Sequence, residues 1–175
     1  DEARSAAAAS PEDVGAWLRL AMAAAAAGET NTELAALEQA EQLTKGDPAI
    51  RAMRAEAMSR AADGQVTIPA RELIADILTE DPSEPRALFL SGLAAYQDEN
   101  FGAAVEIWLR LQSLSAPDAP WMALLADNIA DAAKAGGIDL DAVTAARGPD
   151  AKTMAAAAEM SDEDRAEMIE GMVEG

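Results

Sequence analysis

The side chains that could do chemistry in this sequence are carboxylates. The 175-residue chain contains 32 Asp and Glu residues but no Cys and no His. A Ser-His-Asp triad, a thiolate nucleophile and a Cys or His metal site therefore cannot be built from it. Acids close in sequence, such as Asp139 with Asp141, or Asp162 with Glu163, could act as a general acid and base. Helix caps and exposed turns explain these acids better, so we expect neither an enzyme nor a cofactor.

The charge limits the partners of the chain. Its formal net charge of −19 would repel a phosphate backbone and an anionic membrane surface. We therefore expect no nucleic acid and no direct lipid binding by this fragment, whereas a basic peptide would be attracted. No run of 18 apolar residues is present, so nothing predicts a membrane span. Because the chain begins at Asp1 without Met, we expect a fragment from which a signal or anchor has been removed.

Helical signals follow one another along the chain. Alanine, the best helix former, makes up about a quarter of the residues. The first ten residues are low in complexity and are expected to fray. Ser10 and Pro11 then predict a helix start, with Ser10 as the N-cap, and Gly28 ends this helix. Apolar residues recur at helical spacing through the following segments, and none alternates with a period of two. The sequence predicts an all-α protein.

The helical pattern repeats with a nearly constant period. Gly92 and Ala126 lie 34 residues apart, at the place where two paired helices need a small side chain. Met58 precedes Gly92 by the same interval, and Ala21 precedes Met58 by 37, which predicts a three-residue insertion near Lys45. In the second helix of each pair, small residues and larger ones one turn later recur at Ala70 and Ala104, and at Leu37, Ile74 and Trp108.

This period and its small and large positions resemble a tetratricopeptide repeat (TPR) protein. The resemblance implies a helical-repeat solenoid of three repeats over residues 1–137, closed by a capping helix near 120–135. Residues 138–175 then form a C-terminal helical extension.

Two segments resemble a narrower family. The first reads RAADGQVT at 60–67 and continues to RALF at 86–89 and LAAY at 93–96. The second is the tail, with AAAAEMS at 155–161 and MIEGMVEG at 168–175. Both are similar to the C-terminal periplasmic domain of the CcmI/CycH-type cytochrome c maturation proteins, over roughly 60–120 and the tail.

This resemblance implies a chaperone without catalytic activity. Proteins of that family are tethered to the inner membrane through an amino-terminal part that this chain lacks. Their periplasmic TPR domain holds apocytochrome c, mainly by its C-terminal helix, and presents it to the haem ligation complex. The alternative is a TPR adaptor for another envelope complex, without specificity for cytochromes.

In a TPR superhelix the first helix of each pair lines a concave groove. Phe89, Leu93 and Tyr96 recur at i, i+4 and i+7, which predicts an apolar stripe on one helix face. With the small residues of the second unit and acidic rims, such a groove suits an amphipathic helix carrying Lys or Arg. The peptide-binding candidates are Leu18, Met22, Glu56, Ser59, Asp63, Arg86, Phe89, Leu93, Tyr96 and Asp127.

Several of these positions have a second interpretation. Phe89 and Leu93 could belong to the core between repeats, whereas Tyr96 is expected to reach the groove because its hydroxyl needs a partner. Asp127 could belong to a solvated face. The tryptophans at 17, 108 and 121 are expected to be core wedges. The Met-rich tail could pack over the end of the solenoid or fold into the groove as a lid.

Overall fold

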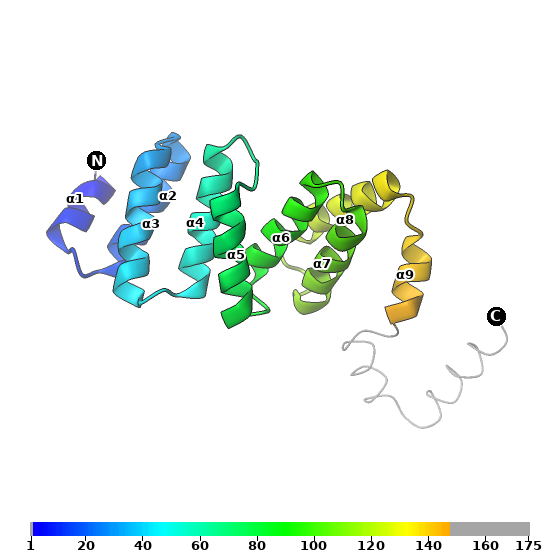
Figure 1. Ribbon diagram of the computed structural model, residues 1–175. Helices are drawn as coiled ribbons and strands as arrows, with labels where there is room; N and C mark the ends of the chain where they lie inside the picture. Colours follow the sequence, from blue (N-terminus) through cyan, green and yellow to red (C-terminus); the bar gives the residue numbers. More distant parts are fainter. Residues whose placement is uncertain (1, 148–175) are drawn as a thin grey trace, which may run out of the picture. The chain divides into compact units, whose positions relative to one another are not determined.

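The computed structural model describes residues 2–147, and every regular element in that range is an α-helix (Figure 1). The all-α prediction is therefore confirmed. The chain divides into two compact units at Gly136, and the Met-rich tail lies outside the described residues. The first unit contains α1 (Glu2–Ala9), α2 (Val14–Ala27), α3 (Thr30–Thr44), α4 (Pro48–Ala61), α5 (Ile68–Glu80), α6 (Pro85–Gln97), α7 (Phe101–Leu114) and α8 (Met122–Gly136). The described part of the second unit contains α9 (Leu140–Arg147).

The first unit is a helical-repeat solenoid. Helices α2 and α3, α4 and α5, and α6 and α7 pack as three successive hairpins, and α8 packs on α7 (Figure 1). Each hairpin also contacts the next one, through α3 with α4 and through α5 with α6. The first helices of the second and third hairpins meet as well, through contacts of α4 with α6. Three hairpins followed by a single helix confirm the predicted architecture.

Short polar side chains cap the start of α2, α4 and α7. Asp47 accepts hydrogen bonds from the backbone N–H groups of Ala49 (2.9 Å) and Ile50 (3.2 Å), and Pro48 occupies the first turn of α4. The start of α2 differs from the prediction. Its N-cap is Asp13, whose carboxylate accepts from the N–H of Gly15 at 2.9 Å, and not Ser10.

The expected fraying of the first ten residues is wrong. Residues 2–9 form α1, which packs on α2 and buries Ala7 completely. Arg4 on this helix pairs with Glu29, between α2 and α3, at 2.9 Å. Ser10 does not begin α2 because its N–H still donates to the carbonyl of Ala6. The alanine run is therefore a packed helix whose small side chains permit close approach to α2.

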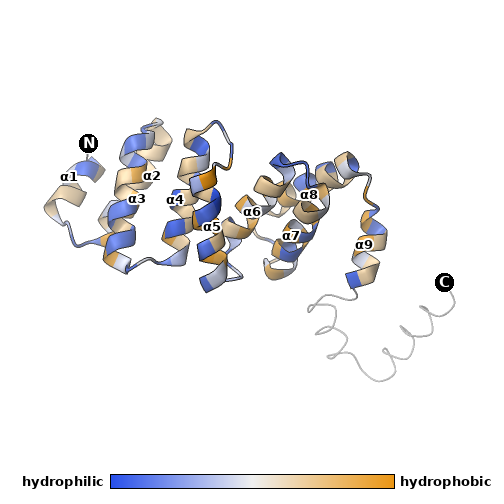
Figure 2. Cartoon of the chain, in the orientation of Figure 1, coloured by the Kyte–Doolittle hydropathy of each residue, from blue (hydrophilic) through white to orange (hydrophobic). Residues whose placement is uncertain are grey.

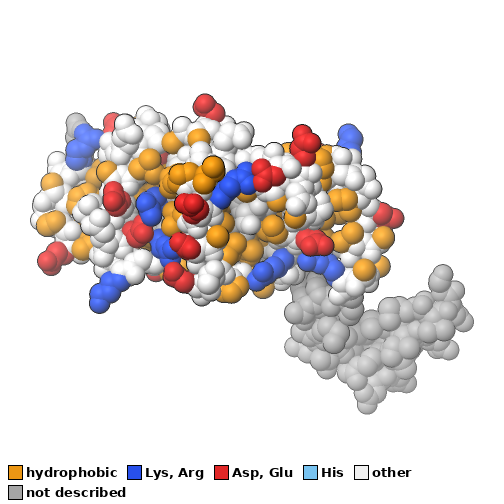
Figure 3. Space-filling view, in the orientation of Figure 1, with side chains coloured by type: hydrophobic (Ala, Val, Ile, Leu, Met, Phe, Trp, Pro, Cys, Tyr) orange, Lys and Arg blue, Asp and Glu red, His pale blue; other side chains and the backbone are white. Residues whose placement is uncertain are grey.

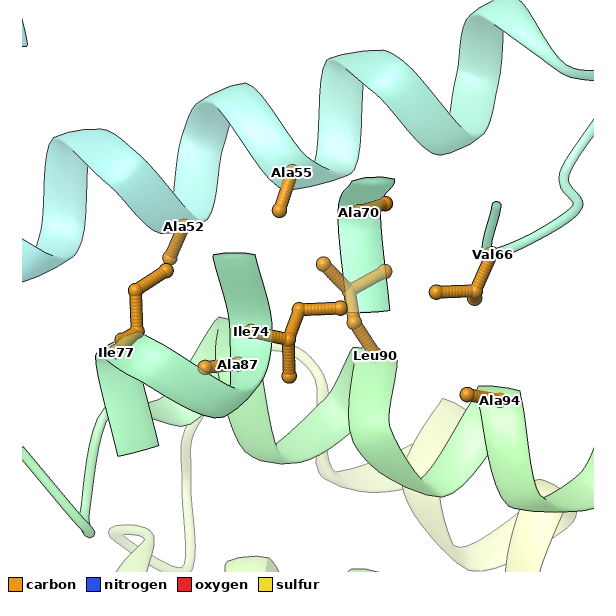
Figure 4. Packing of buried hydrophobic residues seen from close by; sticks show 9 residues of the cluster. All are labelled: Ala52, Ala55, Val66, Ala70, Ile74, Ile77, Ala87, Leu90 and Ala94. Carbon is orange, nitrogen blue, oxygen red and sulfur yellow. The ribbon is translucent and has the colours of Figure 1, made fainter. Parts of the chain in front are cut away.

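The core is built largely from alanine. Along each helix of the first unit, apolar residues gather on some faces and hydrophilic residues on others (Figure 2). On the face seen in Figure 3, apolar side chains lie between charged ones, and Lys or Arg often lies next to Asp or Glu. Between α4, α5 and α6 the buried cluster comprises Ala52, Ala55, Val66, Ala70, Ile74, Ile77, Ala87, Leu90 and Ala94 (Figure 4). Helices with such small side chains can pack closely, with a few branched residues filling the space between them.

The predicted register of the second repeat is wrong by three residues. Ala55 is fully buried in this cluster, whereas Met58 only flanks it, so Ala55 corresponds to Ala21, 34 residues earlier, and to Gly92 (Figure 4). The extra three residues therefore lie between α4 and α5, and not near Lys45. There, Val66 is buried, its N–H donates to the Gln97 side chain at 2.9 Å, and the Gln97 amide donates to the carbonyl of Gly64 at 2.8 Å.

The third repeat contains the predicted pair of a small and a large residue. Trp108 on α7 is only 1% exposed and fills the space left by Gly92 on α6. A Cβ atom on Gly92 would lie 2.3 Å from the Trp108 Nε1 atom, which is closer than atoms can approach. The Trp108 indole N–H donates to the carbonyl of Phe89 at 3.0 Å. This pairing holds α6 against α7 and places Phe89.

The three tryptophans do not share one environment. Trp108 is buried as expected, and Trp17 is half-buried with its indole N–H donating to Pro11 O at 2.9 Å. Trp121 is 43% exposed, so its assignment to the core is wrong. It directly precedes α8, the last helix of the first unit, and no later helix of that unit covers it. For the same reason Ala126 is exposed rather than packed against a partner helix.

No helix among residues 2–147 is long and apolar enough to cross a lipid bilayer. Within the same residues, no three Asp or Glu side chains cluster in a way that could hold a metal ion.

Candidate functional site

A hollow of about 300 Å³ opens between α4, α6, α7 and the start of α8. We call it the apolar hollow, because six of its nine lining residues are apolar. They are Pro85, Phe89, Leu90, Leu111, Trp121 and Leu124, and the other three are Glu56, Glu84 and Arg86. All nine belong to the first unit. An open apolar depression of this size is typical of a binding site for a protein side chain or a small molecule.

The apolar lining has a buried floor and an exposed wall. Leu90 and Leu111 are buried at the floor, and the Phe89 ring lies 6.1 Å from the Trp108 ring. Trp121 and Leu124 are 43% and 57% exposed, respectively, although both are large and apolar. The Trp121 indole N–H donates to the Ser115 hydroxyl at 3.2 Å. Exposed apolar side chains beside a preformed hollow indicate a docking surface for another protein.

The rim of the hollow is charged but locally balanced. Glu56 on α4 pairs with Arg86 on α6 at 3.2 Å and with Arg60 at 3.4 Å. Arg60 also donates to both carboxylate oxygens of the buried Glu33, at 2.7 and 2.8 Å. These bonds outweigh partial desolvation and raise the pKa of the Arg60 guanidinium above its usual value. The acidic rim expected at Glu56 is therefore neutralised by two arginines.

Glu84 forms the acidic corner of the hollow and begins α6. Its side chain is almost completely buried and accepts a hydrogen bond from the backbone N–H of Ala87 at 2.6 Å. Burial raises the pKa of the Glu84 carboxyl above its usual value. The Ala87 N–H and the charge of Arg86 act in the opposite direction. Glu84 is therefore the N-cap of α6, and its buried carboxyl is poorly accessible to a ligand.

The structure brings three of the ten peptide-binding candidates together at the hollow, Glu56, Arg86 and Phe89. Leu93 and Tyr96, expected on the same stripe as Phe89, lie elsewhere. Leu93 packs against the cluster between α4, α5 and α6.

The Tyr96 ring contacts the rings of Phe101, at 5.3 Å, and Trp108, at 6.1 Å. It therefore packs within its own hairpin and does not line the apolar hollow with Phe89. Phe101, the first residue of α7, packs edge-on against the Tyr96 ring.

Ser59 is also misplaced by the sequence prediction. It is 4% exposed, and its hydroxyl donates to the carbonyl of Ala55 within α4 at 3.0 Å. Ser59 follows Ala55 by one turn of α4, so it lies on the side of this helix that faces the core. Ala52 and Ala55, expected as a groove floor, are fully buried in the same way.

The remaining four candidates lie away from the lining of the hollow. Leu18 packs on the buried cluster formed by α1, α2, α3 and α4, and Met22 on α2 is 65% exposed. Asp63 is exposed in the α4–α5 loop with a left-handed φ of 53°. Asp127 is exposed on α8, one turn after Leu124.

Sequence reasoning missed four lining residues of importance, Glu84, Leu111, Trp121 and Leu124. One signal could have indicated two of them. Trp121 and Leu124 lie at the start of the last helix before Gly136, where a solenoid has no further repeat to cover them.

The hairpins and the Gly92–Trp108 contact define a TPR-type helical-repeat solenoid, which carries the apolar hollow. Its sequence matches the family model described as "Cytochrome c-type biogenesis protein H TPR domain" over residues 3–122, which is more than half of the chain. The chain therefore belongs to this family.

Two curated relatives are named cytochrome c-type biogenesis protein CycH. The protein of Rhizobium meliloti is 33% identical over 172 residues, and that of Bradyrhizobium diazoefficiens is 30% identical over 164 residues. Each alignment covers 94% of this chain but 42% of the relative. The chain thus corresponds to less than half the length of these relatives.

Proposed function

We propose that this chain is a binding domain without catalytic activity that acts in the maturation of c-type cytochromes. Its membership of the family and the names of both CycH relatives support the process. The preformed apolar hollow supports the activity, because it offers contact surface for a protein segment. Among residues 2–147 there is no acidic cluster suited to hold a metal ion.

The cargo in this proposal is apocytochrome c, held by its C-terminal helix. The single observation that carries it is the exposure of Trp121 and Leu124 beside Phe89 at the apolar hollow. An amphipathic helix buries its apolar face in such a surface, through side chains spaced three, four and seven residues apart. In a folded holocytochrome the apolar face of that helix is packed against the rest of the protein. The haem-free chain leaves it available.

The rest of the proposal concerns the cellular setting. The domain would act in the periplasm, tethered to the inner membrane by an amino-terminal part, and would pass apocytochrome c to the haem ligation complex. The part of the CycH relatives that lies outside the alignment is long enough to contain an anchor, since this chain covers 42% of them.

Calorimetric titration of this chain with a synthetic C-terminal helix of a c-type cytochrome tests the binding site. Leu124→Ala removes an exposed apolar wall of the hollow and should weaken binding about 5- to 100-fold, as for an interface hot spot. Met22→Ala removes a similarly exposed apolar side chain from α2 and should leave the affinity within about twofold. Circular dichroism should show the same helix content in both variants.

Two results would contradict the proposal. Absence of peptide binding would leave a TPR adaptor whose partner is another envelope protein. Equal weakening by Leu124→Ala and Met22→Ala would mean that the helix binds elsewhere on the solenoid.

A further inference from the structure

Helix α8 carries two acids in line with the wall of the apolar hollow. Asp127 and Asp131 follow Leu124 by three and seven residues, and both are exposed. At 3.6 residues per turn, they lie within about 60° of Leu124 around the helix axis. The opposite side of α8 is buried through Leu125 and Ile129. We call Asp127 and Asp131 the acidic stripe of α8.

The acidic stripe provides free negative charge that the hollow itself lacks. At the hollow, Glu56 is neutralised by Arg86 and Arg60, and Glu84 is buried. Within the part of the chain that the structure describes, no salt bridge or hydrogen bond engages the side chain of Asp127 or Asp131. A charged group can therefore approach them without first displacing a partner.

We propose that the docked helix is recognised in two parts, an apolar anchor in the hollow and basic residues opposite the acidic stripe of α8. This inference rests on the proposed function. The hollow, at about 300 Å³, has roughly twice the volume of a protein cavity that binds benzene, so it accommodates a large apolar side chain. Leu124 and Asp131 are separated by about 10 Å along the helix axis, at 1.5 Å per residue. The ligand therefore carries Lys or Arg about one and two turns from its anchor.

The charge pattern favours a basic helix over two other ligands, a second copy of this chain and the segment 148–175. A second copy of this chain has the same net charge of −19 and would repel the stripe. Residues 148–175 of the chain contain eight acids against two bases, so this segment is a poor ligand for the same reason. A basic amphipathic helix satisfies both the hollow and the stripe. Because exposed ion pairs contribute little affinity individually, the stripe mainly sets the register of the ligand and its rate of association.

A charge-reversal experiment tests the two-part site. The chain is titrated with a helical peptide that carries one apolar anchor and Lys residues four and seven positions away, and with its Lys→Glu counterpart. Asp127→Lys with Asp131→Lys should lower the affinity for the Lys peptide about tenfold at low salt, and less at high salt. The same variant should bind the Glu peptide better than the original chain does.

The control places the same change of charge on other helices. Glu38→Lys with Glu72→Lys alters exposed acids on α3 and α5 and should change the affinity for the Lys peptide less than about threefold. If the acidic-stripe variant behaves as this control does, while Leu124→Ala still weakens binding, the proposed function stands and the two-part site is refuted. If the original chain binds neither the Lys peptide nor a cytochrome helix, both proposals fail.

Discussion

Substitution of Gly92 by Ala tests how the third repeat holds the hollow together. The added Cβ atom would lie 2.3, 2.5 and 2.7 Å from three atoms of the Trp108 indole. Trp108 is 1% exposed and cannot move aside without breaking its hydrogen bond to the carbonyl of Phe89. Overpacking costs about 1–3 kcal/mol and loss of the hydrogen bond about 1 kcal/mol. The greater helix propensity of Ala returns up to about 1 kcal/mol, so we expect a net loss of about 1–3 kcal/mol in the free energy of unfolding.

Urea denaturation followed by circular dichroism gives this free energy, and Gly102→Ala is the matched control. Gly102 also lies in a helix, but a Cβ atom there would meet nothing within 4 Å, so this change should be neutral or stabilising by up to about 1 kcal/mol. A second variant relieves the clash. Trp108→Leu should destabilise the original chain, yet it should cost less in the Gly92→Ala background. Equal stability of Gly92→Ala and Gly102→Ala would refute the packing described here.

Two further predictions concern ionised groups. Arg60→Ala leaves the Glu33 carboxylate buried without the guanidinium nitrogen that donates to both of its oxygens. It should cost about 1–3 kcal/mol, less than a fully buried pair because Arg60 is half-exposed. Urea denaturation of this variant and of the double variant Glu33→Ala with Arg60→Ala checks the prediction. The double variant should regain most of the lost free energy of unfolding. A cost below about 0.5 kcal/mol for Arg60→Ala alone would contradict it. Because the pKa of Glu84 is raised in the folded state, the stability of the original chain relative to Glu84→Gln should fall as the pH rises above 4.5. Denaturation curves across that range check it, and a stability difference that is constant or grows with pH would show that burial of the carboxyl is not the dominant influence.

Much of the fold could be predicted because local signals agree with one another. Alanine content, helix caps and the 34-residue spacing all indicate the same hairpins, and Gly92 with Trp108 marks a close helix contact. The register of the second repeat could not be found in this way. Helix α4 has alanines at 52, 55 and 57, so several registers offer a small residue at the contact. The deciding feature is the burial of Ala55 in the cluster with α5 and α6, which depends on neighbours distant in sequence.

The hollow was harder to predict than the fold. Trp121 is a large apolar residue at the start of a predicted helix and therefore resembles a core residue. It is exposed because the first unit ends at Gly136, with no further helix to cover it. Tyr96 resembles a groove residue until Phe101 is seen to pack against it. In both cases the decisive information is which neighbour covers the side chain, and the spacing of residues along one helix does not contain it.

The central claim is that the apolar hollow holds a cytochrome helix that is free only before haem attachment. A labelled C-terminal helix bound to this chain, displaced in a competition titration by unlabelled apocytochrome c or holocytochrome c, tests it most directly. We predict displacement by the apo form at concentrations close to those of the free peptide, and no displacement by the holo form. Equal displacement by both forms, or by neither, would contradict the claim.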